Sequence, residues 1–341
     1  MIIRSKAPLR LGLAGGGTDV SPYSDLYGGA ILNASINMYA YTSIEPTDDG
    51  KIGFSLPDFQ ANEEIDSISE IPAEGVFVLH KGVYNRIVKD FNDSKPLSFR
   101  ISSHVDAPAG SGLGTSSTLV VSIVGAFVEW LKLPLGEYDI AQLAYKIERF
   151  DLKMAGGKQD QYAATFGGIN FMEFYAGDKV IVNPLRVRQR FQDELAHNLV
   201  LYYTKISRKS AEIIERQTKN VKKKNETSIE AMHKLKEQSV WMKEAILKGE
   251  IDEMGPILDF GWQYKKRMTK GITNLFLDEV YDSALAAGAT GGKVSGAGGG
   301  GFMTFYCPGI SRYEVEKALQ KFGGNVKRYE FTNEGLKTWT M

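Results

Sequence analysis

The chain has 341 residues, of which 41 are basic and 41 acidic, so its formal net charge is zero. This length exceeds one ordinary core and is typical of two domains. The charge balance excludes a general attraction to nucleic acid or to an anionic membrane, so any anion site must be local.

Cys307 is the single cysteine of the sequence. It excludes a disulfide or a cysteine metal site within one chain and favours a reducing, cytoplasmic location. The four histidines show no metal-ligand spacing. We expect no signal peptide, because the first apolar run is too short, and no membrane span, because no stretch reaches about 18 apolar residues.

The first part of the chain predicts strands separated by turns. Leucines alternate with polar or small residues over residues 9–13, and the glycines at residues 15–17 then break the pattern into a loop. Thr18 and Asp19 follow this loop, where they can either hydrogen-bond a ligand or form an Asx-type turn.

The next segments are expected to alternate between strands and surface. Residues 30–36 and 40–44 predict a pair of strands, and residues 77–92 fit a helix. The polar and acidic residues 47–75 predict an irregular surface.

A glycine-rich loop over residues 108–118 follows a predicted strand at residues 101–105. Its three closely spaced glycines can turn backbone N–H groups inward, and four hydroxyl residues follow where a helix begins. This pattern favours a phosphate-binding loop. It is not a Walker A loop, because no lysine lies between Pro108 and Trp130. The alternative is an ordinary glycine-rich turn with a Ser/Thr cap.

Two helices are expected after this loop, and carboxylates lie at the end of the second. Residues 116–133 are apolar on nearly every side, and their length predicts a buried helix. We expect Asp139 to cap the second helix, which ends at Gly156. Glu148 borders its apolar stripe and either extends to solvent or serves a site. Asp160, between two glutamines, either caps a short helix or faces a pocket.

A domain boundary is expected near residue 190, dividing the chain into residues 1–190 and 191–341. It follows a predicted strand at residues 169–174 and lies in a charged connection over residues 180–196, from which glycine disappears.

The second half predicts a strand at residues 197–204, then mainly helices. We expect Asn225 to start a long helix, another to run from Ile251, and Thr273 to cap a third. The lysines at residues 222–224 are expected to form a solvated face.

A second glycine-rich loop covers residues 291–301 and leads into a predicted strand that begins at Phe302. Residues 296–301 satisfy the G-x-G-x-x-G pattern. A dinucleotide-binding fingerprint requires a helix at that point, so the context excludes it. A final helix is expected over residues 311–321, and a strand in the tail.

The glycine clusters carry a resemblance that extends over the whole chain. Residues 6–19, 108–117 and 293–302 resemble, in this order, the three motifs of the galactokinase, homoserine kinase, mevalonate kinase and phosphomevalonate kinase (GHMP) superfamily. The resemblance implies an α+β, two-domain GHMP kinase fold, with an N-terminal S5-like α/β domain and a C-terminal ferredoxin-like α/β domain.

The resemblance implies ATP and Mg²⁺ as cofactors. Magnesium would be held by Glu148 with Ser116, or with the neighbouring Thr115. The residues it implies around ATP form one continuous loop, namely Pro108, Gly110, Ser111, Gly112, Leu113, Gly114, Thr115, Ser116 and Ser117.

Asp160 matches the aspartate that faces the acceptor hydroxyl in the family, and Arg10 matches the basic residue that pairs with it. Asp160 would act either as a general base or, with Arg10, by orienting the hydroxyl and stabilising developing charge. The residues implied at the substrate are Thr18, Asp19, Gly296 and Gly298.

The first motif looks like the branch that phosphorylates the anomeric hydroxyl of sugars, especially bacterial D-glycero-D-manno-heptose 7-phosphate 1-kinases. The product would be heptose 1,7-bisphosphate, which feeds GDP-heptose synthesis. Gly16 and Gly17 replace the Glu-His pair of galactokinase, which argues against galactose. The alternatives are a fucokinase-like free-sugar 1-kinase and a non-catalytic sugar or nucleotide sensor. A mevalonate-type kinase is disfavoured, because that branch usually has lysine where Arg10 stands.

A phosphorylated substrate needs its own anion site. The candidate is the helix start formed by Ser207, Arg208, Lys209 and Ser210, and a surface cap is the alternative. We expect a small-molecule sugar phosphate as partner, neither nucleic acid nor membrane, and a monomer or homodimer.

Overall fold

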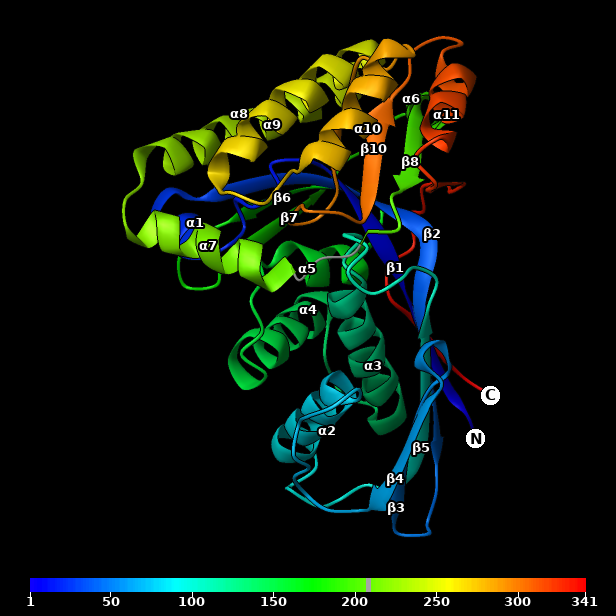
Figure 1. The fold of residues 1–341 in the computed structure, drawn as a ribbon. Coiled ribbons are helices and arrows are strands. Elements are labelled where there is room, and N and C mark those ends of the chain that lie inside the picture. Colours follow the sequence, from blue (N-terminus) through cyan, green and yellow to red (C-terminus); the bar gives the residue numbers. More distant parts are fainter. Residues whose placement is uncertain (207–209) are drawn as a thin grey trace.

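The computed structural model describes residues 1–206 and 210–341 (Figure 1). Its first sheet has the strand order β12-β1-β2-β5-β3-β4, and β6 and β7 extend it beside β2. The strands of this sheet are β1 (Ile3–Ala14), β2 (Gly29–Pro46), β3 (Lys51–Leu56), β4 (Ala61–Asp66), β5 (Phe99–Val105), β6 (Ile169–Phe174), β7 (Val180–Pro184) and β12 (Lys337–Thr340).

Strand β2 corrects the expectation of two paired strands over residues 30–44. No glycine or proline interrupts that segment, so it continues as one strand of 18 residues. Its first half pairs with β6 and its second half with β5, while β1 pairs with both halves.

The segment 47–75 is also not simply irregular, because it contains the antiparallel pair β3 and β4. Alternate residues of β3, from Ile52 to Leu56, are buried. The mostly polar β4 forms the edge of the sheet.

Helices alternate along the chain with the strands of the first sheet. They are α1 (Tyr23–Tyr27), α2 (Val78–Phe91), α3 (Thr115–Leu131), α4 (Glu137–Lys146) and α5 (Gln159–Phe166). The predicted buried helix is confirmed, because every residue of α3 from Ser117 to Phe127 is buried, and α3 packs on β1 and β2.

Helix α4 begins three residues earlier than expected, because its N-cap is Gly136 and not Asp139. Asp139 still serves its first turn, since its Oδ2 accepts the Gly136 N–H at 3.0 Å. The helix ends before Gly156, because it passes into a π-helical turn, Ile147–Asp151, and then into a loop. This turn carries Glu148.

The second sheet has the strand order β11-β8-β10-β9. Its strands are β8 (Leu199–Tyr203), β9 (Gly291–Val294), β10 (Phe302–Tyr306) and β11 (Asn325–Lys327). The helices of the second half are α6 (Gln189–Asn198), α7 (Ser210–Lys222), α8 (Glu226–Lys248), α9 (Met254–Met268), α10 (Leu275–Ala286) and α11 (Arg312–Gln320). No helix of the described residues is both long and apolar enough to span a bilayer.

Two features of the second half depart from the expectations. The connection over residues 180–196 contains β7 and most of α6. Helix α10 is capped by Asn274, whose Oδ1 accepts the Leu277 N–H at 3.1 Å, because the Thr273 hydroxyl donates to Asp278 instead. The predicted cap of α8 at Asn225 is confirmed.

One hydrophobic cluster joins the two halves of the chain. Leu11 of β1 belongs to the same hydrophobic cluster as Met242 and Ile246 of α8, and Figure 1 shows α8 and α9 lying across one end of the first sheet. The tail returns to this sheet, where β12 pairs with β1 and brings both termini together. The boundary near residue 190 falls within α6 and stays a prediction.

The two glycine-rich loops meet backbone to backbone. A Cβ added at Gly112 would lie 2.6 Å from the Ser295 carbonyl oxygen, and one at Gly301 would lie 2.4 Å from the Ser111 carbonyl oxygen. The same Ser111 oxygen accepts the Phe302 N–H at 2.8 Å. The chain therefore needs glycine here so that distant segments can touch.

We expect Gly301→Ala to lower the free energy of unfolding by about 2 kcal/mol more than Gly50→Ala. Both glycines have positive φ, 84° and 72°, so each alanine pays a similar backbone cost of about 1–2 kcal/mol. A Cβ at Gly50 meets nothing within 4 Å. Urea denaturation measures the difference, and equal losses in the two variants would contradict the tight loop contact.

Candidate active site

A cavity of about 1230 Å³ lies against both glycine-rich loops. Its wall is formed by the loop after β1, the segment from the end of β5 to the start of α3, and the turn and loop between α4 and α5. Residues of α2, α7 and α9, of the end of β3 with the turn after it, and of the second glycine-rich loop also line it. A cavity of this size accommodates a nucleotide together with a small acceptor.

The loop before α3, which the resemblance implies at the ATP phosphates, lines this cavity. Gly110, Gly112 and Gly114 all have positive φ, and the first turn of α3 directs unpaired N–H groups toward the cavity end. The implied ATP residues that line the cavity are Pro108, Gly110, Gly112, Gly114, Thr115, Ser116 and Ser117.

Ser111 and Leu113 lie in the same loop but do not line the cavity. Both are fully buried, and their carbonyl oxygens accept N–H groups of Phe302 and Arg10. The structure therefore gives these two residues a role in holding the loop.

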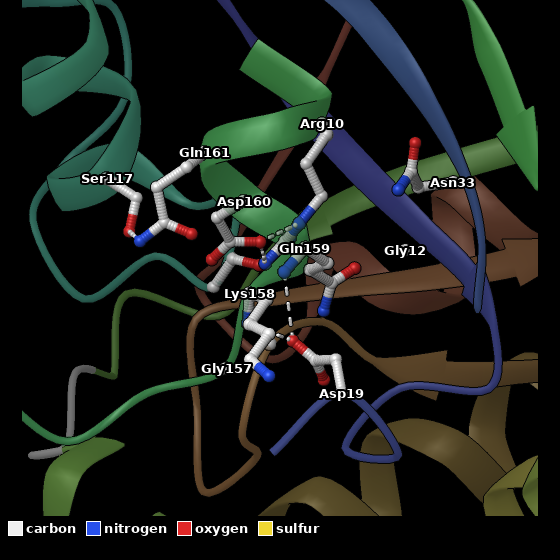
Figure 2. Close-up of polar contacts among 12 residues, drawn as sticks. Arg10, Gly12, Asp19, Asn33, Ser117, Gly157, Lys158, Gln159, Asp160 and Gln161 are labelled. Carbon is white, nitrogen blue, oxygen red and sulfur yellow. Dashed lines mark hydrogen bonds and ion pairs between the residues drawn. The ribbon is translucent and has the colours of Figure 1, made fainter. Parts of the chain in front are cut away.

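Arg10 and Asp160 form a partly buried ion pair on the wall of the cavity (Figure 2). Arg10 Nε and Nη2 both lie 2.7 Å from Asp160 Oδ1, and Arg10 Nη1 donates to the Gly112 carbonyl oxygen at 2.6 Å. A Cβ added at Gly114 would lie 3.3 Å from Asp160 Oδ2. Asp160 therefore stands directly beside the phosphate-binding loop.

Glu148 lies 1% exposed on the cavity wall. Gln161 Nε2 donates to its carboxylate and to Ser117 Oγ at 3.1 Å, and Arg149 Nη1 lies 3.7 Å from Glu148 Oε1. Burial raises the pKa of Glu148. Ser116 also lines the cavity, but the hydroxyl linked to Glu148 through Gln161 is that of Ser117.

Asp19 holds the start of the helix that carries Asp160. Its Oδ2 accepts the N–H groups of Lys158 and Gln159 at 2.8 and 3.0 Å, as Figure 2 shows for Gln159. A Cβ added at Gly157 would collide with this carboxylate at 1.8 Å. Burial raises the pKa of Asp19. Asp19 lines the cavity, but these bonds make it a positioning residue for α5.

Thr18 is not brought to the cavity. It is fully buried, and its hydroxyl donates to the Gly15 and Ala30 carbonyl oxygens while accepting the Ala30 N–H. This network fastens the loop after β1 to the start of β2, which is an ordinary structural use of a threonine at a turn.

Gly296 lines the cavity, whereas Gly298 packs against Ile272 outside its wall. The proposed anion site at Ser207 and Arg208 lies outside the described residues.

Sequence reasoning assigned no role to Lys265 of α9 and Lys293 of β9. Both are buried, 5% and 6% exposed. Lys265 Nζ donates to the Gly296 carbonyl oxygen at 2.5 Å, and Lys293 Nζ to the Gly12 carbonyl oxygen at 2.7 Å. No signal in the sequence distinguishes Lys265 from its neighbour Lys266.

Comparison with protein families matches residues 79–168 to the GHMP kinases N terminal domain and residues 242–325 to the GHMP kinases C terminal region. Together with the paired Arg10 and Asp160 beside the phosphate loop, this shows that the chain belongs to the GHMP kinase family. It is an ATP-dependent phosphotransferase.

Particular relatives match almost the whole chain. The D-glycero-alpha-D-manno-heptose 7-phosphate kinase of Campylobacter jejuni is 49% identical over 339 residues, which cover 99% of each chain. The crystal structure of a D-glycero-D-manno-heptose 1-phosphate kinase from Bacteroides thetaiotaomicron is 48% identical, with a TM-score of 0.85 and 99% coverage of both chains.

More distant structures share the fold alone. Lactococcus lactis galactokinase is 18% identical, with a TM-score of 0.77 over 98% of this chain and 95% of that one. The expected two-domain GHMP kinase fold is confirmed.

We expect Asp19→Ala to lower the free energy of unfolding by about 2–4 kcal/mol, because two buried N–H donors lose their acceptor. Asp19→Asn retains an amide oxygen that can accept both bonds, so it should lose less than half as much. Urea denaturation of the two variants tests this. An unfolding free energy of Asp19→Ala equal to that of the wild type would contradict the positioning role.

Proposed function

We propose that this kinase transfers the γ-phosphoryl group of ATP to the anomeric hydroxyl of D-glycero-D-manno-heptose 7-phosphate, giving heptose 1,7-bisphosphate. The observation that carries the proposal is the Arg10–Asp160 pair beside the phosphate loop, in a chain 49% identical along its length to a protein named as a heptose 7-phosphate kinase.

The geometry of Asp160 supports its role toward the acceptor. Arg10 occupies Oδ1, so Oδ2, which lies close to Gly114, is left to accept the hydrogen bond of the anomeric hydroxyl. The new bond forms between this hydroxyl oxygen and the γ-phosphorus, and the bond from that phosphorus to the β–γ bridging oxygen breaks. Asp160 Oδ2 takes up the hydroxyl proton, and ADP leaves.

The chain's contribution to this transfer is mainly positioning and neutralisation of charge. The N-terminus of α3 and the loop around Gly112 hold the phosphates through backbone N–H groups. Arg10 fixes the direction of the Asp160 carboxylate and ties it to the loop through the Gly112 carbonyl oxygen. Acceptor and phosphates are thereby aligned by one network.

The residues present also fit a magnesium ion, which we propose as the second cofactor. Mg²⁺ prefers oxygen ligands and takes one or two carboxylates together with substrate phosphates. Glu148 supplies a buried carboxylate on the cavity wall, and the Ser116 hydroxyl lines the same cavity. Within residues 1–206 and 210–341, no group of three or more His, Cys, Asp or Glu side chains could hold a metal, so phosphate oxygens would have to supply further ligands. When bound, the ion neutralises charge on the β- and γ-phosphate oxygens.

The cytoplasmic location, the place in GDP-heptose synthesis and the monomeric or dimeric state remain predictions from the sequence.

The proposed acceptor is tested by ATP consumption of the purified protein with magnesium and separate acceptors. We expect turnover with heptose 7-phosphate and little or none with mannose 6-phosphate, fucose, galactose or mevalonate. Asp160→Asn should lower turnover by about 10²–10⁴-fold while leaving nucleotide affinity nearly unchanged.

Other results would redirect the assignment. Turnover of fucose but not of the heptose phosphate would favour a free-sugar 1-kinase. Nucleotide binding without turnover of any acceptor would favour a sensor. Equal losses of turnover and nucleotide affinity in Asp160→Asn would remove its catalytic role.

We expect Glu148→Gln to raise the Mg²⁺ concentration needed for half-maximal activity by at least about 10-fold, because the amide keeps the shape but removes the charge. The control is Glu314→Gln, at an exposed glutamate of α11. Titrating activity with Mg²⁺ at saturating ATP gives the comparison. Identical curves for Glu148→Gln and the wild type would exclude Glu148 as a ligand.

A further inference from the structure

Two buried lysine ammonium groups lie near the part of the cavity wall formed by Gly16, without a carboxylate partner. Lys265 and Lys293 each donate to a backbone carbonyl oxygen. Among the residues that the structure describes, neither lysine forms an ion pair within 4.0 Å. A buried cation without a counter-charge is costly, so this pair needs an explanation beyond packing.

The two ammonium groups flank one small volume next to Gly16. A Cβ added at Gly16 would lie 3.7 Å from Lys265 Nζ and 3.9 Å from Lys293 Nζ. Gly16 and Lys265 both line the cavity that Asp160 and Arg10 also line. The missing side chain at position 16 therefore leaves space in front of the lysines, on the wall shared with the reacting groups.

The nearby side chains leave this positive charge largely unneutralised. The Arg10 charge is matched by Asp160, and the Asp19 carboxylate, which also acts on Lys265, accepts two N–H groups of α5. Burial, reinforced by the Arg10 charge, lowers the pKa of Lys265 to about 8. Burial and the charges of Lys265 and Arg10 also lower the pKa of Lys293 well below its usual value. An anionic ligand group at this point would raise the pKa of both lysines again, because it favours their charged forms.

We propose that Lys265, with Lys293 behind it, binds the phosphate monoester of the acceptor sugar. This inference rests on the proposed function and adds the group that selects a sugar phosphate over a free sugar. The two negative charges of a phosphate dianion match the positive charges of the two ammonium groups. Lys265, which lines the cavity, would donate a hydrogen bond to the phosphate. The site accounts for phosphate recognition within the described residues, without Ser207 or Arg208.

The kinetic test compares Lys265→Met with the wild type and with Lys266→Met. Lys266 is the next residue of α9 and lies over the Trp262 ring, so it controls for loss of a lysine from this helix. Lys265→Met should raise the KM for heptose 7-phosphate by about 10- to 100-fold and leave the KM for ATP within about threefold. Lys265→Arg should recover part of the loss, and Lys266→Met should behave as the wild type.

Binding is measured separately by thermal denaturation, so that the site is tested whatever the turnover. Heptose 7-phosphate and mannose 6-phosphate should raise the Tm of the wild type more than mannose does, and this difference should disappear in Lys265→Met. Without ligand, Lys265→Met should melt at the same temperature or higher, because it buries no charge.

The two proposals fail in different ways. Absent turnover of heptose 7-phosphate in the wild type, with phosphate-dependent protection that requires Lys265, overturns the proposed reaction and keeps the anion site. Normal turnover with equal protection of the wild type and Lys265→Met overturns the anion site. A rise in the KM for ATP alone also overturns it, because Lys265 would then serve the nucleotide.

Discussion

The contact between the two glycine-rich loops is the constraint on which the rest of the site depends. The backbone of Gly112 packs against that of Ser295, and the backbone of Gly301 packs against that of Ser111. A hydrogen bond from the Phe302 N–H to the Ser111 carbonyl oxygen holds the two loops together. A side chain at either glycine would separate the loops. This contact between the loops fixes the N-terminus of α3 against the start of β10. The second half of the chain therefore determines the position of the loop that is proposed to bind phosphate.

The proposed catalytic residues, Arg10 and Asp160, are connected to this loop contact by hydrogen bonds. Arg10 bonds the Gly112 carbonyl oxygen on one side and Asp160 on the other, so the carboxylate is held relative to the phosphate loop itself. Asp19 fixes the backbone N–H groups of Lys158 and Gln159, directly before Asp160, and the lack of a side chain at Gly157 leaves room for its carboxylate. Two residues of the N-terminal segment, Arg10 and Asp19, thus restrain a carboxylate that lies far along the chain. Such restraint gives the alignment that phosphoryl transfer requires.

Local sequence patterns predicted the parts of the fold that local physics decides. The apolar helix α3, its glycine loop and the Asn225 cap follow from composition and spacing. The partners of β2 could not be predicted, because a strand that changes neighbours halfway looks like two strands. The motif resemblance implied the pairing of Arg10 with Asp160, whereas Lys265 differs from Lys266 only by which helix face is buried, a tertiary property.

The distribution of positive charge gives the cavity two ends with different chemistry. The phosphate loop has no lysine between Pro108 and Trp130, and it meets anions with backbone N–H groups and a helix dipole. The ammonium groups of Lys265 and Lys293 are instead placed beside Gly16, in the first glycine motif. A chain with zero net charge can therefore bind two separate anions, because the nucleotide is met by dipoles and the acceptor phosphate by buried cations. Since Asp160 neutralises Arg10, the pair proposed to meet the acceptor hydroxyl carries no excess charge.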